Sequence, residues 1–145
     1  NGIFKNMYKL RTDIESETGF ENKLTKVMPQ ISEILKVPDF YYVTSDGKMR
    51  AVLDKNFNAD VSDLSEIMEE DLFSQGSLDL IKKHSPKFYK VLYEKGFESV
   101  LISRIRKKDK VKGYLICAVN RSLRIWQENE YAILYYLAEL LSDDL

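Results

Sequence analysis

Two strand-like segments separated by only four residues constrain the fold of this chain most. Residues 99–106 and 111–119 are rich in β-branched and other apolar side chains, and so short a loop between them predicts an antiparallel hairpin. With the tip in the middle of the loop, Ser103 pairs with Tyr114. Because side chains alternate across a strand, one face of the hairpin is then apolar and carries Val100, Ile102, Leu115 and Cys117. The other face is mixed and carries Ser99, Leu101, Ser103, Tyr114, Ile116 and Ala118.

The rest of the chain predicts helices and a second hairpin around this one. An apolar seam at heptad spacing indicates a first helix and consists of Ile3, Met7, Leu10 and Ile14. Thr18 and Glu21 fit a capping box that starts a second helix, which ends before Pro38. Residues 40–53 form a hairpin around Asp46–Gly47. Residues 56–60 are expected to be a loop and 64–73 to be helical, and further helices are expected at 85–96 and 127–141. Hairpins with segregated helices predict an α+β fold.

Composition excludes several classes of protein. The 145 residues predict a single domain. The 22 basic and 23 acidic side chains nearly cancel, whereas nucleic-acid-binding domains usually carry a basic excess. Cys117 is the only cysteine, so an internal disulfide is impossible and a cytoplasmic location is expected. No apolar run is long enough for a membrane span, so we expect no membrane insertion by this domain.

The loop between the two long strands is strongly basic, because six cations lie between Arg104 and Lys112. Stacking aromatic side chains, which a single-strand nucleic-acid site uses, are missing from its tip. Lysines at a hairpin end also discourage pairing of sheet edges. We therefore interpret the cluster as a solvated turn and expect no nucleic acid as a partner.

Three stretches between residues 96 and 141 resemble the C-terminal half of a GAF domain, and the chain from Phe20 onward fits the first half of that family more loosely. That family shows a Gly–x–x–Ser strand entry, a Gly–x–Leu on the next strand, and Arg–x–aromatic–x–x–x–Glu before its last helix. The matching residues are Gly96, Ser99, Gly113, Leu115, Arg124, Trp126 and Glu130. The resemblance implies a profilin-like three-layer sandwich, in which helices cover both faces of a central antiparallel sheet of five or six strands. PAS domains share a similar layout and stay open as an alternative.

The same resemblance implies a ligand pocket between the sheet and the middle helices. The mixed face suits such a pocket, and its candidate lining residues are Tyr42, Ser99, Ser103 and Tyr114. The cyclic-nucleotide signature of the family is not found. One histidine cannot build a multi-histidine metal site, and no paired carboxylates in an apolar cleft support catalysis. A bilin link through Cys117 is disfavoured, because its place on the apolar face is typical of a buried thiol. We expect no enzyme activity, metal or cofactor.

These observations together predict a ligand-sensing regulatory domain of a bacterial signalling protein. Residues 1–18 form a signalling and dimerisation helix, and residues 19–145 form the GAF-like domain. The apolar seam of the first helix, Ile3, Met7, Leu10 and Ile14, is the expected homodimer interface. The terminal helices would then carry the signal to a C-terminal output domain, such as a diguanylate cyclase, a histidine kinase or a transcription regulator. The alternative is a ligand-free interaction scaffold of the same fold, its pocket filled by aromatic side chains.

Overall fold

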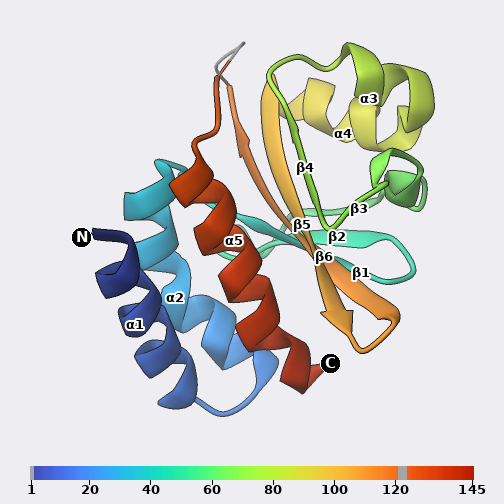
Figure 1. Cartoon of the computed structure of the whole chain (residues 1–145). Helices are drawn as coiled ribbons and strands as arrows, with labels where there is room; N and C mark the ends of the chain where they lie inside the picture. Colours follow the sequence, from blue (N-terminus) through green and yellow to red (C-terminus); the bar gives the residue numbers. More distant parts are fainter. Residues whose placement is uncertain (1, 121–123) are drawn as a thin grey trace.

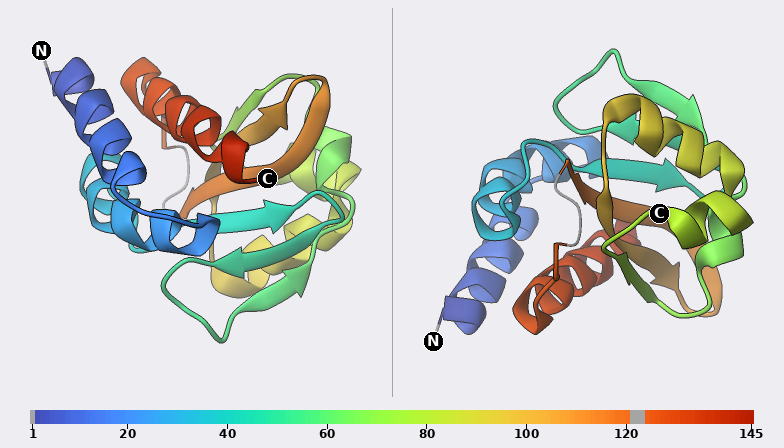
Figure 2. Two further views of the ribbon diagram at one scale, coloured as in Figure 1. Left: turned by 90° about the horizontal axis from the view of Figure 1, so that it is seen from below. Right: turned by 90° about the horizontal axis from the view of Figure 1, so that it is seen from above.

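A computed structural model describes residues 2–120 and 124–145. They form three layers, in which an antiparallel sheet lies between two layers of helices (Figure 1). One face of the sheet is covered by the helices nearest the chain ends, namely α1 (Gly2–Glu15), α2 (Phe20–Leu35) and α5 (Glu128–Leu141). The opposite face carries α3 (Asp79–His84), α4 (Pro86–Lys95) and the 3-10 turn η1 (Leu64–Ile67). Figure 2 shows the same separation of the two helical layers from two further directions. The expected α+β sandwich is confirmed.

The sheet has six strands in the order β3-β2-β1-β6-β5-β4, and every neighbouring pair is antiparallel. The strands are β1 (Tyr41–Thr44), β2 (Lys48–Ala51), β3 (Asn58–Asp60), β4 (Leu72–Gln75), β5 (Ser99–Lys107) and β6 (Lys110–Val119). The β5–β6 hairpin lies at the centre of the domain, and β3 and β4 form the two edges. A second 3-10 turn, η2 (Ser142–Asp144), follows α5.

Each face of the sheet has its own apolar core. The core under the terminal helices includes Leu10, Val27, Leu101, Cys117 and Leu134. A second core lies under η1, α3 and α4, and it includes Met49, Ile81, Phe88, Ile102 and Ile116. Burial of apolar area on both faces is the main stabilising term for a sheet enclosed in this way.

The register of the central hairpin differs from the expected one by one residue over most of its length. Arg106 pairs with Val111 as predicted, but Ile105 pairs with Gly113, so Lys112 is an extra residue in a β-bulge. Beyond the bulge, Ser103 lies opposite Leu115 rather than Tyr114. A slip of one residue moves a strand's side chains to the other face. The β6 residues therefore lie on the expected faces, whereas the assignment of the β5 residues is wrong.

The segment from residue 56 to residue 75 also differs from the prediction. Residues 58–60 form the edge strand β3 rather than a loop, and the expected helix over 64–73 is only η1 followed by β4. The helical spacing of its apolar residues is overridden because Phe73 and its neighbours pair with β5. Helix α2 begins after Gly19 without a side-chain cap, so the capping box at Thr18 is also wrong.

The seam of α1 packs inside the chain instead of forming a free surface. Leu10 and Ile14 are buried in the core under the terminal helices, and Ile3 and Met7 are half-buried against it. Leu10 and Ile14 are therefore covered by the chain itself, whereas the predicted homodimer interface needs the seam at the surface. No helix in the described ranges is both long enough and apolar enough to cross a bilayer.

Candidate functional site

The structure does not bring the four predicted ligand-binding residues onto one face of the sheet. Tyr114 belongs to the core under α3 and α4, as expected. Tyr42 belongs to the opposite core, where its ring contacts Phe20 at a centroid distance of 4.7 Å. Ser99 and Ser103 are each two residues from Leu101 along β5, so they share its face and lie under the terminal helices. The register shift at the bulge is the reason why both serines lie on this face rather than on the predicted one.

Ser99 and Ser103 also have structural hydrogen bonds where they lie. The Ser99 hydroxyl accepts a hydrogen bond from the Arg124 amide at 3.3 Å. The Ser103 hydroxyl donates to the Arg104 carbonyl at 3.2 Å, and its side chain is fully buried. A ligand held against the middle-helix face would thus meet Tyr114 alone among the four residues.

The region between the sheet and the middle helices is filled by the protein's own side chains. Phe88 of α4 and Ile81 of α3 are both fully buried there, and they pack over Met49, Ile102 and Tyr114. Tyr41 of β1 adds edge contacts with Phe57 and Phe97 at centroid distances of 5.5 and 5.9 Å. Such close-packed aromatic and aliphatic side chains occupy the volume that an enclosed ligand would need.

Arg104 is the charged residue of this face that the predicted register missed. It lies opposite Tyr114 in the sheet, donates a hydrogen bond to the Met68 carbonyl, and lies 3.6 Å from the Asp71 carboxylate. Burial raises the pKa of Tyr114, and the nearby Arg104 guanidinium opposes part of that effect. Arg106 adds a second contact to Asp71 at 3.4 Å. These contacts attach the segment after η1 to β5. They could have been predicted from the sequence only if the bulge in the hairpin had been recognised.

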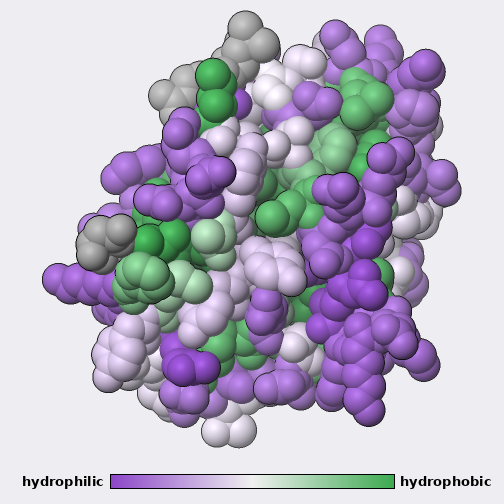
Figure 3. Space-filling model, in the orientation of Figure 1, coloured by the Kyte–Doolittle hydropathy of each residue, from purple (hydrophilic) through white to green (hydrophobic). Residues whose placement is uncertain are grey.

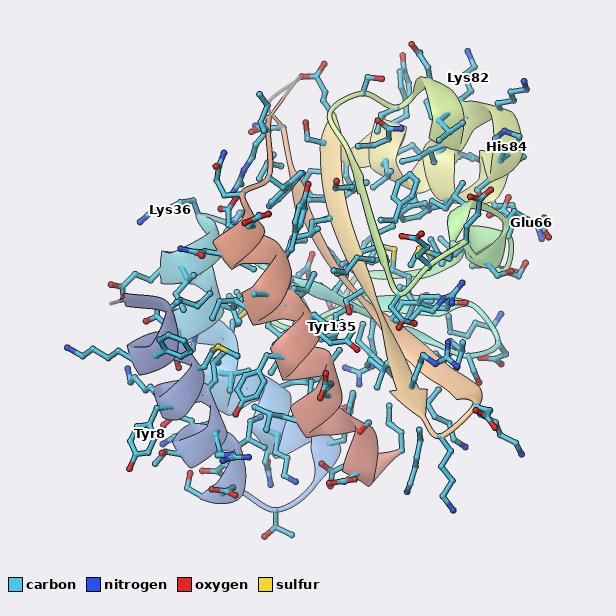
Figure 4. All side chains as sticks on the ribbon, in the orientation of Figure 1. Tyr8, Lys36, Glu66, Lys82, His84 and Tyr135 are labelled. Carbon is cyan, nitrogen blue, oxygen red and sulfur yellow. The ribbon has the colours of Figure 1, made fainter. Side chains whose placement is uncertain are left out.

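Several surface clefts lie among the described residues, and three of them adjoin the edge strand β4. A cleft of about 390 Å³ lies between β4, η1 and α3, and it is lined by Glu66, Ile67, Glu69, Glu70, Leu72, Phe73, Leu80 and His84. A second, of about 370 Å³, reaches from Asp71 to Tyr135 of α5. A third, of about 350 Å³, lies between Ser74 and the start of α5. Glu66 and His84 lie together on the η1 and α3 side in Figure 4.

A further cleft of about 370 Å³ lies beside α4 and is rich in aromatic side chains. Tyr89 and Tyr93 are stacked there with centroids 5.9 Å apart, and Leu78 and Phe97 also line the cleft. Tyr93 is 69% exposed. The stacked rings offer a flat apolar surface to a planar molecule.

The motif at the start of α5 forms a buried polar network. The Arg124 guanidinium donates hydrogen bonds of 2.6 Å to the Glu130 carboxylate and of 2.6 Å to the Leu35 carbonyl. It also lies 3.8 Å from the centroid of the Trp126 ring. Glu130 accepts a hydrogen bond from the Gln127 amide at 2.8 Å, which completes a capping box. The network therefore joins the end of α2 to the start of α5.

The Cys117 thiol is buried, and the described His, Cys, Asp and Glu side chains form no three-residue metal site. Cys117 is fully buried under the terminal helices, as its face predicted, and burial raises its pKa to about 12. A thiol with so high a pKa is a poor nucleophile at neutral pH. Within residues 2–120 and 124–145, no group of three His, Cys, Asp or Glu side chains could hold a metal ion.

Comparison with solved structures shows that the chain has the fold of GAF domains. The GAF domain of an Acinetobacter phosphoenolpyruvate-protein phosphotransferase superposes with a TM-score of 0.75 at 14% identity, over 99% of this chain and 92% of that one. The corresponding domain from Coxiella burnetii gives 0.74 at 17% identity, over 98% and 91%. The phycocyanobilin-bound GAF domain of a cyanobacterial phytochrome gives 0.70 at 13% identity, over 97% and 92%.

Sequence comparison adds no closer relationship. No family model matches the chain, and no curated protein matches it. Since these three structural neighbours are each below one-fifth identity, they establish the architecture, whereas function has to be argued from the residues themselves.

Proposed function

We propose that this chain is a regulatory domain of a larger signalling protein and that it acts through its surfaces, with its interior filled. The observation that carries this proposal is the packing of Phe88 and Ile81 against Tyr114 between the sheet and the middle helices. Proteins that share this fold include phosphotransferases and phytochromes of signalling systems. The filled interior favours the interaction scaffold over a domain that encloses its ligand. We place the domain in the cytoplasm, where a single free thiol is usual.

The filled interior is tested by opening it deliberately. Phe88→Ala removes a fully buried ring and should leave a cavity, at a cost of about 3–5 kcal/mol in unfolding free energy. Benzene should raise the Tm of this variant, because apolar cavities bind such probes. The wild-type domain should show no shift with benzene, and its mass in native mass spectrometry should equal that of the polypeptide. A co-purified small molecule, or a benzene-induced shift in the wild type, would contradict a filled interior.

The same proposal includes transmission through the terminal helices and a homodimer. Helices α1 and α5 pack against each other beneath the sheet (Figures 1 and 2), so a shift of one repositions the other. Because the seam of α1 is internal, the dimer would use the outer face of α1. Phe4 and Tyr8 lie one turn apart there, each 72% exposed, and Figure 4 shows Tyr8 pointing away from the domain. Exposed apolar patches commonly mark an interface.

Sedimentation of two double variants tests this dimer. Phe4→Ser with Tyr8→Ser should convert the wild-type dimer to monomer at high micromolar concentration. Lys5→Ser with Lys9→Ser changes other exposed positions of the same helix and should leave the dimer intact. A monomeric wild type, or equal effects of the two variants, would remove the α1 interface from the proposal.

A second candidate function, ligand sensing, is favoured by the cleft beside α4. The stacked Tyr89 and Tyr93 rings would hold a planar apolar molecule at the surface rather than in the interior. Titration with flavin mononucleotide, used as a planar probe, should quench its fluorescence on stacking. Tyr93→Ala should abolish this quenching, and Tyr8→Ala, which removes an equally exposed ring elsewhere, should not. Equal quenching by both variants would reject the cleft as a site.

A further inference from the structure

The free edge of β4 leaves backbone groups without partners in the described part of the chain. The Arg104 amide donates to the Asp71 carbonyl at 2.8 Å, and this contact fixes which residues of β4 face β5. In an antiparallel ladder every second residue exchanges hydrogen bonds with its partner strand. The backbone amides and carbonyls of Phe73 and Gln75 therefore point toward β5, whereas those of Leu72 and Ser74 point away from it, to the outside of the sheet. Buried or half-buried backbone groups of this kind normally acquire a partner.

The two edges of the sheet differ in how well they are protected. Strand β3 is three residues long, and its end residues Asn58 and Asp60 are exposed and polar. Strand β4 reads Leu–Phe–Ser–Gln, and all four of its residues are only half-buried. Proteins usually block an edge with lysine, proline or a bulge. Strand β4 contains none of the three between Leu72 and Gln75, so it can accept another strand.

A cleft with an apolar floor and an acidic rim lies directly beside this edge. Leu72 and Phe73 contribute the strand side of the floor, and Ile67 and Leu80 contribute the side formed by η1 and α3. Glu66, Glu69 and Glu70 line the same cleft, and all three are exposed. In the view of Figure 3, apolar side chains are exposed near the middle of the molecule, and hydrophilic side chains lie beside them. The cleft can thus hold apolar side chains while its rim attracts cations.

We propose that the free edge of β4 binds an extended peptide segment that carries apolar residues and lysine or arginine on the same face. The segment would pair with the outward backbone groups of Leu72 and Ser74, as in other cases of strand addition. Every second side chain would point toward the cleft, so the apolar residues and the cations that meet the glutamates share these cleft-facing positions. A second copy of the same edge is a poorer occupant, because two β4 edges would bring two acidic rims together. This inference goes beyond the proposed function and holds whether or not the interior is filled.

The direct test uses proline on the outward side of the strand. Ser74→Pro removes an amide that faces the partner but not one that faces β5, so the six-stranded sheet should remain folded. Ser74→Ala is the matched control, because it keeps the amide and removes only the hydroxyl that contacts Tyr131 at 2.9 Å. The probe is a fluorescein-labelled peptide of repeating Val–Ser–Lys–Ser, called the lysine–valine peptide below, which places valine and lysine on one face of a strand. Binding is followed by anisotropy. We expect roughly tenfold weaker binding for the proline variant, equal to one lost hydrogen bond of about 1.4 kcal/mol, and less than about twofold for the alanine variant.

Charge reversal tests the chemistry of the partner independently. Glu69→Lys with Glu70→Lys should weaken binding of the lysine–valine peptide roughly tenfold, and should create binding of a glutamate–valine peptide. Glu15→Lys with Glu94→Lys, at two exposed positions that do not line this cleft, is the control and should change neither. Absence of binding to the folded wild type would overturn the proposal, and so would equal binding of both peptides. Binding unaffected by either β4-side variant would also overturn it, and none of these results would affect the benzene test of the interior.

Discussion

Breaking the Arg124–Glu130 pair should destabilise the domain strongly, because both side chains are almost enclosed. Their side chains are only 8% and 14% exposed, and the guanidinium has a short contact to the carboxylate, a second to the Leu35 carbonyl and a ring beneath it. Removing one member of a buried pair leaves the other charge without compensation, and this costs about 3–5 kcal/mol. Arg124→Met and Glu130→Gln are the appropriate single changes because each preserves the approximate shape of its side chain.

The expected shift in melting temperature follows from the size of the chain. Unfolding entropy is about 2.1 cal/mol/K per residue, so 145 residues give roughly 0.3 kcal/mol/K. A loss of about 3–5 kcal/mol then lowers the Tm by about 10–16 °C. The decrease in Tm for Glu130→Gln should lie near the lower end of this range, because the new amide oxygen can still accept a hydrogen bond from the Gln127 amide.

Calorimetry and urea unfolding of both single variants and the double variant form a complete thermodynamic cycle. The double variant should lose less stability than the sum of the two single losses, since it leaves no unpaired charge. Far-UV circular dichroism should confirm that all three variants fold. Strictly additive losses, or single losses below about 1 kcal/mol, would refute the reasoning that this pair acts as a buried electrostatic link.

Two further predictions concern titratable groups. The Cys117 thiol, whose pKa burial raises to about 12, should react with an aromatic disulfide reagent only as fast as the protein unfolds, with urea-unfolded protein as the positive control. Stoichiometric labelling of the folded domain within seconds would contradict its burial. The pKa of Tyr41 is raised to about 12 by burial and by Asp39 and Asp54, so its contribution to stability is complete below pH 10 and is lost as pH rises from about 10 to 12. Tyr41→Phe should therefore flatten the fall in unfolding free energy over that range, by at most about 2.7 kcal/mol, and an unchanged slope would argue against it.

The sequence predicted the central hairpin but not the residue at which its register changes. Alternation of side chains identified both strands and the correct faces for Tyr114 and Cys117. The bulge at Lys112 depends on contacts that are distant in sequence. A Cβ at Gly113 would come within 2.7 Å of the Val43 carbonyl oxygen and 2.8 Å of the Tyr42 ring, so β1 approaches the hairpin at this glycine. The effect of the bulge on the position of Ser103 could not be predicted from the spacing of residues in the sequence.

The edge strand β4 was missed for a related reason. Its segment has apolar residues at helical spacing, and local spacing is the main signal available in a single sequence. The extended conformation is instead stabilised by pairing of Phe73 with Ile102, and by the contacts of Arg104 and Arg106 with Asp71. Long-range pairing of this kind decides strand formation more than intrinsic propensity does.

The residues that carried the resemblance explain why the fold could be predicted more completely than the site. Gly96 ends α4 in the left-handed region, with φ of 74°, Gly113 admits β1, and Arg124 with Glu130 joins α5 to α2. Each of these roles is a requirement of the backbone or of helix packing, so the motif predicts the architecture. The residues of the two proposed binding sites lie outside the motif, such as Tyr93 on α4 and Glu69 beside β4. A domain with this fold can therefore keep the motif and change its partner by substituting only the residues that line its clefts and its free edge.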